Sequence, residues 1–377
     1  ASSPFSPPAN RLLMSTNRGD DFLPTPPHLS THDMAKVRWS MDSTGGITND
    51  ATGAETYGTI TTLAESYVRP GLLMAGTDDG NVWLTHNNGA SWENLTGRFP
   101  GVPPKTYVVR IEPSHFDSTT FYVAFENHRV NDFTPYLFVT SDFGRTFKSI
   151  VADLPKGGPD FLHVIREDPV NRDVLYVGTD VGAYISRDRG QSWQKFMSGL
   201  PTVPVHDLKI HPRDHELIAA THGRGIWIVD VAALEELRDS VYAKGGAYLS
   251  APKTAYAFSE SPGADISSAQ STFKGRSAPF GADIVYRLTS GSPKDTVKLV
   301  ITNVKGDTLK TLTGRGGAGI HHVTWDLAAK PPAPTPLTQA TRRHSLVTAR
   351  EPDAAFVSPA AAQLAPTDFA ITQALCD

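Results

Sequence analysis

The stretch LYVGTDVGAYISRDRGQSW at residues 175–193 decides the fold, because residues 72–92 repeat its plan as LLMAGTDDGNVWLTHNNGASW. Each copy reads as an apolar run, Gly-Thr-Asp, a second apolar run, and a polar loop that closes on Gly and Trp. Short β-branched and aromatic runs bounded by Gly and Asp are typical of strands. A repeat on this scale indicates stacked units, each of which buries its faces against its neighbours.

The polar loop occurs four times, beginning at Ser15, Thr85, Thr140 and Ser186. The intervals of 70, 55 and 46 residues approach the ~40–50 residues of a four-stranded propeller blade. An Asp or Asn side chain can accept backbone N–H bonds in a tight turn, Gly supplies a positive φ, and the closing aromatic ring can pack between sheets. A structural role is therefore predicted for twelve loop residues: Asn17, Gly19, Phe22, Asn87, Gly89, Trp92, Asp142, Gly144, Phe147, Asp188, Gly190 and Trp193.

The loop consensus, S/T-x-D/N-x-G-x-S/T/D-W/F, resembles the Asp-box, or BNR repeat, of sialidases, sortilin-type receptors and the photosystem II assembly factor. Residues 10–235 resemble the C-terminal half of bacterial sortilin-like BNR-repeat proteins, which are longer and have more blades upstream. The array ends at ELIAATHGRGIWIVD (216–230), which lacks the loop, and the helical pattern VAALEELRDSVYA (231–243) follows. The repeats predict an all-β fold, an Asp-box β-propeller of four recognisable blades plus a partial one.

Beyond the helical pattern the chain changes to plain strand alternation in DIVYRL, TVKLVI and GIHHVTWDL. This part is similar to the immunoglobulin-like or fibronectin-like module that follows the propeller in the same relatives, although it offers fewer than the about seven strands of that sandwich. Residues rich in Pro and Ala end the chain. The predicted domains are a propeller at 1–235, a helix or linker at 236–250, a small β-sandwich-like module, short of strands, at 251–330, and an extended tail at 331–377.

Composition excludes several classes of function. The formal net charge is −4, so no basic footprint for nucleic acid is present. Cys376 is the only cysteine, which excludes an internal disulfide and a cysteine-based zinc site. We expect no transmembrane segment and no cofactor, because no apolar stretch approaches the ~20 residues of a spanning helix and no Gly-rich phosphate loop opens a helix. No basic-then-apolar leader pattern begins the chain.

No metal site is predicted either. Three groups of side chains combine His with carboxylates or pair two carboxylates, and each favours a solvated turn because its spacing matches no known ligand pattern. These groups are His115 with Asp117, Glu126 with His128 and Asp132, and Asp78 with Asp79.

A sialidase-like glycoside hydrolase or glycan-binding protein is the alternative that the Asp-boxes raise. Such a site needs arginines for a carboxylate and a Tyr nucleophile with a Glu base. Glu55 and Tyr57 lie two apart on an expected strand, and Arg110, Arg166 and Arg224 fall on successive repeat units. Structural ion pairs explain the same residues more simply, so catalysis is not favoured.

The favoured hypothesis is a non-enzymatic, extracytoplasmic protein-binding or structural subunit of a membrane-associated assembly, because propellers present loops on a rigid scaffold. The resemblance implies a periplasmic or extracellular location and relatives that include an assembly factor of photosynthetic complexes. Other protein subunits are the expected partners, contacted through propeller loops or the 331–377 tail. The candidate contact residues are His128, Arg129, Phe133, His222 and Arg224.

Overall fold

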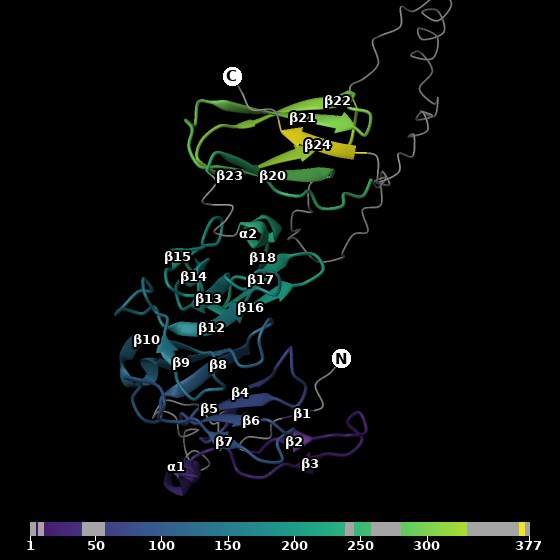
Figure 1. Ribbon diagram of the computed structural model, residues 1–377. Helices are drawn as coiled ribbons and strands as arrows, with labels where there is room; N and C mark the ends of the chain where they lie inside the picture. Colours follow the sequence, from purple (N-terminus) through teal and green to yellow (C-terminus); the bar gives the residue numbers. More distant parts are fainter. Residues whose placement is uncertain are drawn as a thin grey trace, which may run out of the picture. The chain divides into compact units, whose positions relative to one another are not determined.

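The computed structural model describes residues 5–6, 11–39, 57–237, 245–257, 280–329 and 369–373. Contacts divide the chain into two compact units, residues 1–238 and 239–377 (Figure 1). Antiparallel sheets make up both units, so the predicted all-β fold is confirmed.

The first unit holds five sheets among its described residues, and three of these have four strands each, in sequence order. The N-terminal sheet and the last sheet have three strands each. The strands are β1 (Phe5–Ser6), β2 (Leu13–Met14), β3 (Leu23–Pro24), β4 (Ile60–Glu65), β5 (Leu73–Thr77), β6 (Val82–Thr85), β7 (Glu93–Asn94), β8 (Tyr107–Pro113), β9 (Phe121–Asn127), β10 (Asp132–Thr140), β11 (Lys148–Ser149), β12 (Leu162–Glu167), β13 (Leu175–Thr179), β14 (Gly182–Ser186), β15 (Gln194–Lys195), β16 (Val205–His211), β17 (Glu216–Thr221) and β18 (Ile226–Asp230).

The β4–β7 and β12–β15 sheets follow directly from the repeat seen in the sequence. The apolar run before Gly-Thr-Asp forms the second strand, which is buried along its whole length in β5 and β13. The apolar run after it forms the third strand, and the polar loop leads into a fourth strand of only two residues. Strands buried on both faces read as continuous apolar runs rather than as an alternation.

The hydrophobic core lies between successive sheets, as a propeller requires. Separate clusters join the β4–β7 sheet to the β8–β11 sheet, that sheet to β12–β15, and β12–β15 to β16–β18. The first strands of these sheets are neighbours: Thr61 Oγ1 of β4 donates to the Val108 carbonyl of β8 at 2.6 Å, and Arg166 Nε of β12 donates to the Leu208 carbonyl of β16 at 2.6 Å. Four sheets carry a polar loop and the fifth does not, which matches the predicted blades.

Helices are short. They are α1 (Met34–Trp39), the 3-10 helix η2 (His128–Val130) and α2 (Ala232–Glu236). Helix α2 covers part of the helical pattern predicted at 231–243; residues 238–244 lie outside the described residues.

Among its described residues, the second unit has two three-stranded sheets, β19-β20-β23 and β22-β21-β24. One apolar cluster includes buried residues from both sheets, among them Ile284, Leu299 and Trp325. The predicted linker contains β19, and the predicted tail contains β24, which pairs with β21. An immunoglobulin-like topology stays a prediction. The strands are β19 (Ala247–Leu249), β20 (Ala282–Leu288), β21 (Thr296–Asn303), β22 (Thr308–Arg315), β23 (Gly319–Trp325) and β24 (Phe369–Gln373).

Candidate functional site

The four polar loops share one hydrogen-bond pattern. In the loop after β14, Ser186 Oγ donates to Asp188 Oδ1 at 2.8 Å and accepts the Gly190 N–H at 2.8 Å. The same Asp188 oxygen accepts the Ser192 N–H at 2.8 Å. The equivalent bonds recur in the other three loops at 2.7–3.0 Å. The loop polar groups are thus engaged in holding the turn.

Each loop also places a left-handed pair of residues at the same point, as in Arg189 (φ 60°) and Gly190 (φ 85°). A Cβ at Gly190 would lie 2.8 Å from the Ile150 Cβ, so this glycine is required by space as well as by its φ. The closing aromatic differs between loops: Trp193 is buried and donates to the Ile150 carbonyl at 2.7 Å, whereas Phe22 is 45% exposed. Phe147 is buried and Trp92 half-buried.

Two of the three arginines of the glycosidase alternative meet in an ion network on the first strands. Arg166 of β12 contacts Glu112 of β8 at 2.6 Å and Asp207 of β16 at 2.8 Å, and Arg110 of β8 contacts Asp207 at 3.1 Å. Burial raises the pKa of Glu112, although the adjacent Arg166 guanidinium opposes that rise. These groups neutralise one another across three blades, which is the chemistry of a structural network.

Tyr57 and Arg224 of that set lie outside this network. Tyr57 is buried, and the Lys36 ammonium lies over its ring, 4.6 Å from the ring centroid. Burial raises the pKa of Tyr57, and the negative charge of Asp79 raises it further. A raised pKa disfavours the phenolate that a nucleophilic role uses. Arg224 lies in the exposed β17–β18 turn. Glu55 lies outside the described residues, so the full catalytic set stays a prediction.

The carboxylates of the turn after β5 hold the backbone together. Asp78 accepts the N–H groups of Gly58 and Thr59 at 2.8–3.1 Å, and Asp79 accepts the Thr31 N–H at 2.6 Å. Burial, and then the neighbouring Asp79 charge, raises the pKa of Asp78 to about 7. The carboxylate oxygens of Asp78 and Asp79 thus accept backbone N–H groups, as predicted for a structural turn.

The other two sequence clusters also make local contacts. Asp117 accepts the Thr119 N–H at 2.9 Å, and the His115 ring stacks on Tyr67 with centroids 3.8 Å apart. Asp132 accepts the Thr134 N–H at 3.0 Å. The second cluster is therefore divided, because Glu126 faces His128 and Arg129 instead.

Three predicted contact residues lie near one end of the β9–β10 hairpin. Glu126 pairs with His128 and Arg129, and the Arg129 guanidinium lies 4.7 Å from the Tyr107 ring centroid. The His128 ring stacks on the Phe161 ring with centroids 4.1 Å apart, and the Phe133 centroid lies 6.2 Å from that of Phe161.

Phe161 continues this group into a row of imidazoles, of which only His222 was predicted from the sequence. The ring centroids of Phe161 and His163 are 4.8 Å apart. The His163 ring stacks on His206 with centroids 4.2 Å apart, and the His206 and His222 centroids are 5.0 Å apart. Asp180 Oδ1 accepts a hydrogen bond from His163 Nε2 at 3.1 Å. Burial lowers the pKa of both His163 and His206, which favours neutral rings. We call His163, Asp180, His206 and His222 the histidine row.

A signal for the row was present in the repeat. His163 in FLHVIRE and His206 in PVHDLKI occupy the same position of the repeat. At that position each first strand has a β-bulge, since the pairing shifts between Leu162 and Val164 and between Val205 and Asp207. A bulge re-aims the side chain that it carries.

The last blade presents an edge with unusual exposure. All five residues of β18 are exposed, and four of them are apolar: Ile226 at 70%, Trp227 at 39%, Ile228 at 60% and Val229 at 45%. β18 ends its sheet, because within the described chain it pairs only with β17. His222 and Arg224, two predicted contact residues, lie in the turn that leads into it. We call Ile226–Val229 the β18 edge.

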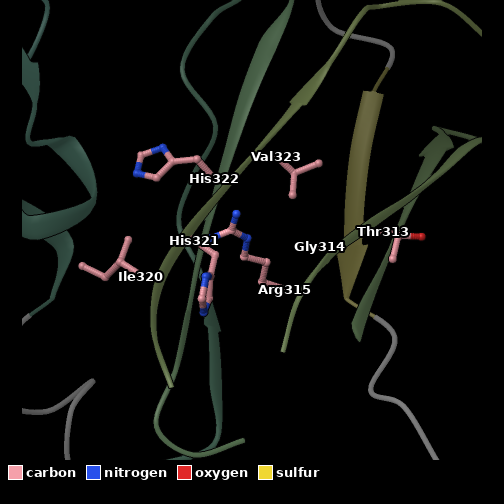
Figure 2. A pocket seen from close by; sticks show the side chains of 7 residues that line it. All are labelled: Thr313, Gly314, Arg315, Ile320, His321, His322 and Val323. Atoms are coloured by element: carbon pink, nitrogen blue, oxygen red, sulfur yellow. The ribbon is translucent and has the colours of Figure 1, made fainter. Parts of the chain in front are cut away.

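A separate pocket of about 570 Å³ lies in the second unit, between residues of β22 and β23 (Figure 2). His321 Nε2 donates to the Gly317 carbonyl at 2.6 Å, and His322 Nδ1 pairs with Asp283 at 2.7 Å. None of the residues singled out in the sequence lines it. The full lining is Thr313, Gly314, Arg315, Ile320, His321, His322 and Val323.

Among the described helices, none is long and apolar enough to cross a membrane.

Sequence comparison gives one distant and partial relative. No family model matches the chain. Vacuolar protein sorting/targeting protein 10 of Emericella nidulans is 29% identical over 127 residues, which are 31% of this chain and 8% of that protein. The match therefore spans less than a tenth of the relative's length.

Solved structures similar to the chain include propellers of several kinds. An ancestral GH74 enzyme is 13% identical with a TM-score of 0.43, over 83% of this chain and 37% of its own. The β-propeller domain of Myceliophteria thermophila Cps50 (Swd1) is 16% identical with a TM-score of 0.42, over 62% and 63%. YCF48 from Cyanidioschyzon merolae is 12% identical with a TM-score of 0.32, over 45% and 55%. The successive antiparallel sheets of the first unit are those of a β-propeller, and the sequence has a distant, partial similarity to Vacuolar protein sorting/targeting protein 10.

Proposed function

We propose that this chain is a non-enzymatic, extracytoplasmic subunit of a larger protein assembly, and that its β18 edge binds an extended segment of a partner protein. The observation that carries the proposal is the run of four exposed apolar residues on an edge strand. Such an edge offers unpaired N–H and C=O groups to another strand and is normally protected. Exposed contiguous apolar surface is typical of an interaction site.

The complete blades show where a partner strand fits. Tyr184 and Ile185 of β14 pair with Lys195 and Gln194 of the fourth strand. Ser186 pairs with the first residue of β13, and Asp230 pairs in the same way with the first residue of β17. By this register, Ile228 and Val229 correspond to Tyr184 and Ile185. A partner segment that pairs at these two residues would complete the last blade.

The surroundings define the chemistry of the segment. Side chains on both faces of β18 are apolar, so the partner strand is expected to carry apolar residues on both of its faces. The exposed Arg224 precedes Ile226 by two residues, which favours an acidic group at that end of the segment. The partial similarity to a protein named for vacuolar sorting is in keeping with protein binding.

The test replaces one side chain of the edge with a charge. Ile228→Lys is compared with Val304→Lys, because Val304 is also exposed, at 64%, but lies in the second unit. Both variants are expressed in the native source, and the chain is purified under gentle detergent extraction with quantitative mass spectrometry of its companions. The same fractionation records the compartment and whether photosynthetic subunits are among them.

Ile228→Lys is expected to lose a companion that wild type and Val304→Lys retain at fixed stoichiometry. Both variants should keep the wild-type melting temperature, because exposed substitutions change stability by only about 0.5 kcal/mol. Retention of every companion by Ile228→Lys would overturn the assignment of the β18 edge. Migration of the wild-type chain as a lone monomer would overturn the subunit role itself.

A further inference from the structure

The histidine row joins two blades at a recurring irregularity of the fold. Each first strand from β4 to β16 has its pairing shift at the same position, and the residues there are Thr61, Val109, His163 and His206. Two consecutive blades therefore carry an imidazole at the position where the others carry Thr and Val. His163 comes from β12 and His206 from β16.

Asp180 completes a cluster with both rings. Its counterpart in the β4–β7 blade is Asp78, whose carboxylate accepts backbone N–H groups of Gly58 and Thr59. The Asp180 carboxylate instead faces His163 Nε2 at 3.1 Å. Among the described residues, His163, Asp180 and His206 form the one group of three such side chains whose ligand atoms all lie within 4.8 Å of one another.

We propose that His163, Asp180 and His206 bind a zinc ion that links the β12–β15 and β16–β18 blades. Two imidazole nitrogens and one carboxylate oxygen suit zinc, whereas Ca²⁺ and Mg²⁺ prefer oxygen-only sites. Ligand atoms around tetrahedral zinc lie about 3.4 Å apart, since each is about 2.0–2.2 Å from the ion. The His163–Asp180 distance of 3.1 Å is close to this spacing, and the ligand atom of His206 lies within 4.8 Å of both, so zinc would draw the exposed His206 ring closer.

His222 is the imidazole next to His206 in the histidine row. The His206 and His222 ring centroids are 5.0 Å apart, and His222 is exposed in the β17–β18 turn. Either water or this imidazole can complete the coordination. Because the ion would connect two blades beside the turn into β18, it would hold the last blade in place. This site is independent of the partner that the β18 edge binds.

The experiment is zinc titration of the full chain after treatment with a chelator, by calorimetry and by metal analysis of desalted protein. The variants are His163→Ala and His206→Ala. The control is His322→Ala, which removes a His–carboxylate pair of the second unit, His322 with Asp283. Thermal melts with and without zinc are recorded for each protein.

Wild type and His322→Ala are expected to bind one zinc per chain and to melt at a higher temperature with zinc than without it. His163→Ala and His206→Ala should bind zinc at least tenfold more weakly and show a smaller rise in melting temperature. Unchanged zinc binding in His206→Ala, which keeps a folded spectrum because the residue is exposed, would overturn the site. If metal analysis finds no zinc in wild type that was loaded with zinc and then desalted, the site is also overturned.

Discussion

The third strands of the last two blades, β14 and β18, have similar apolar sequences but opposite surroundings. All five residues of β14 are buried, whereas all five of β18 are exposed. The difference comes from their neighbours: β14 pairs with a fourth strand and packs against β16–β18, while within the described chain β18 has neither. Burial in a propeller is therefore a property of the adjacent blade as much as of the strand.

The same residue type therefore has different roles in the two strands. An isoleucine between two sheets stabilises the fold by removing apolar surface from water. The same isoleucine on an open edge contributes little until another chain covers it. The predictions below test this division.

The largest effect is expected from truncating one isoleucine in each of these two strands. Ile185→Ala, in the core between the β12–β15 and β16–β18 sheets, should lower the free energy of unfolding by about 3 to 4 kcal/mol through lost burial and a cavity. Ile228→Ala should change it by no more than about 0.5 kcal/mol. Urea denaturation of the purified chain measures both. Equal losses would show that β18 is covered in the isolated chain.

Breaking the ion network should weaken the attachment of the last blade. Arg166→Met leaves Glu112, whose side chain is 3% exposed, without its cationic partner and should cost about 3 kcal/mol. Arg213→Met is the control, because Arg213 pairs with Asp214 but its side chain is 81% exposed. Urea melts that show the same small loss for both arginines would contradict a structural role for the network.

The polar loops should differ in proportion to the burial of their closing ring. Asp188→Ala removes bonds from the loop that is closed by buried Trp193 and should cost about 2 kcal/mol. Asn17→Ala removes the equivalent bonds from the loop closed by exposed Phe22 and should cost less than about 1 kcal/mol. Thermal denaturation compares the two. A larger loss for Asn17→Ala would mean that the turn bonds matter independently of the ring.

The smallest effect is a change in acid stability. Burial alone would raise the pKa of Asp142, but hydrogen bonds from Thr146 and Thr140 lower it to about 2. A lowered folded pKa contributes stability that is complete above the unfolded value of about 3.9 and is lost as pH falls through about 2. Asp142→Asn, the residue type that the loop at Asn87 already uses, should flatten the decline of stability between these limits. A decline in the variant as steep as in wild type would reassign it to other carboxylates.

The sequence predicted the features that one blade determines by itself. Loop residues such as Asp188 and Gly190 could be identified because a tight turn limits which residue types fit. The roles of His163 and β18 depend on what surrounds them. His163 gains its neighbours through a bulge, and these neighbours are Asp180 of the β13–β14 turn and His206 of β16. The IWIV run at 226–229 reads as an ordinary buried strand, and its exposure becomes visible only when the sheet is seen to end there.

The most direct test of the central claim is amide hydrogen exchange of residues 226–229 in the purified chain and in the assembly isolated from its source. We predict fast exchange in the purified chain and at least tenfold slower exchange in the assembly, with residues 182–186 of β14 slow in both. Equally fast exchange of residues 226–229 in both samples would contradict the claim that a partner strand covers the β18 edge. Slow exchange already in the purified chain would also contradict it, because the chain would then cover that edge itself.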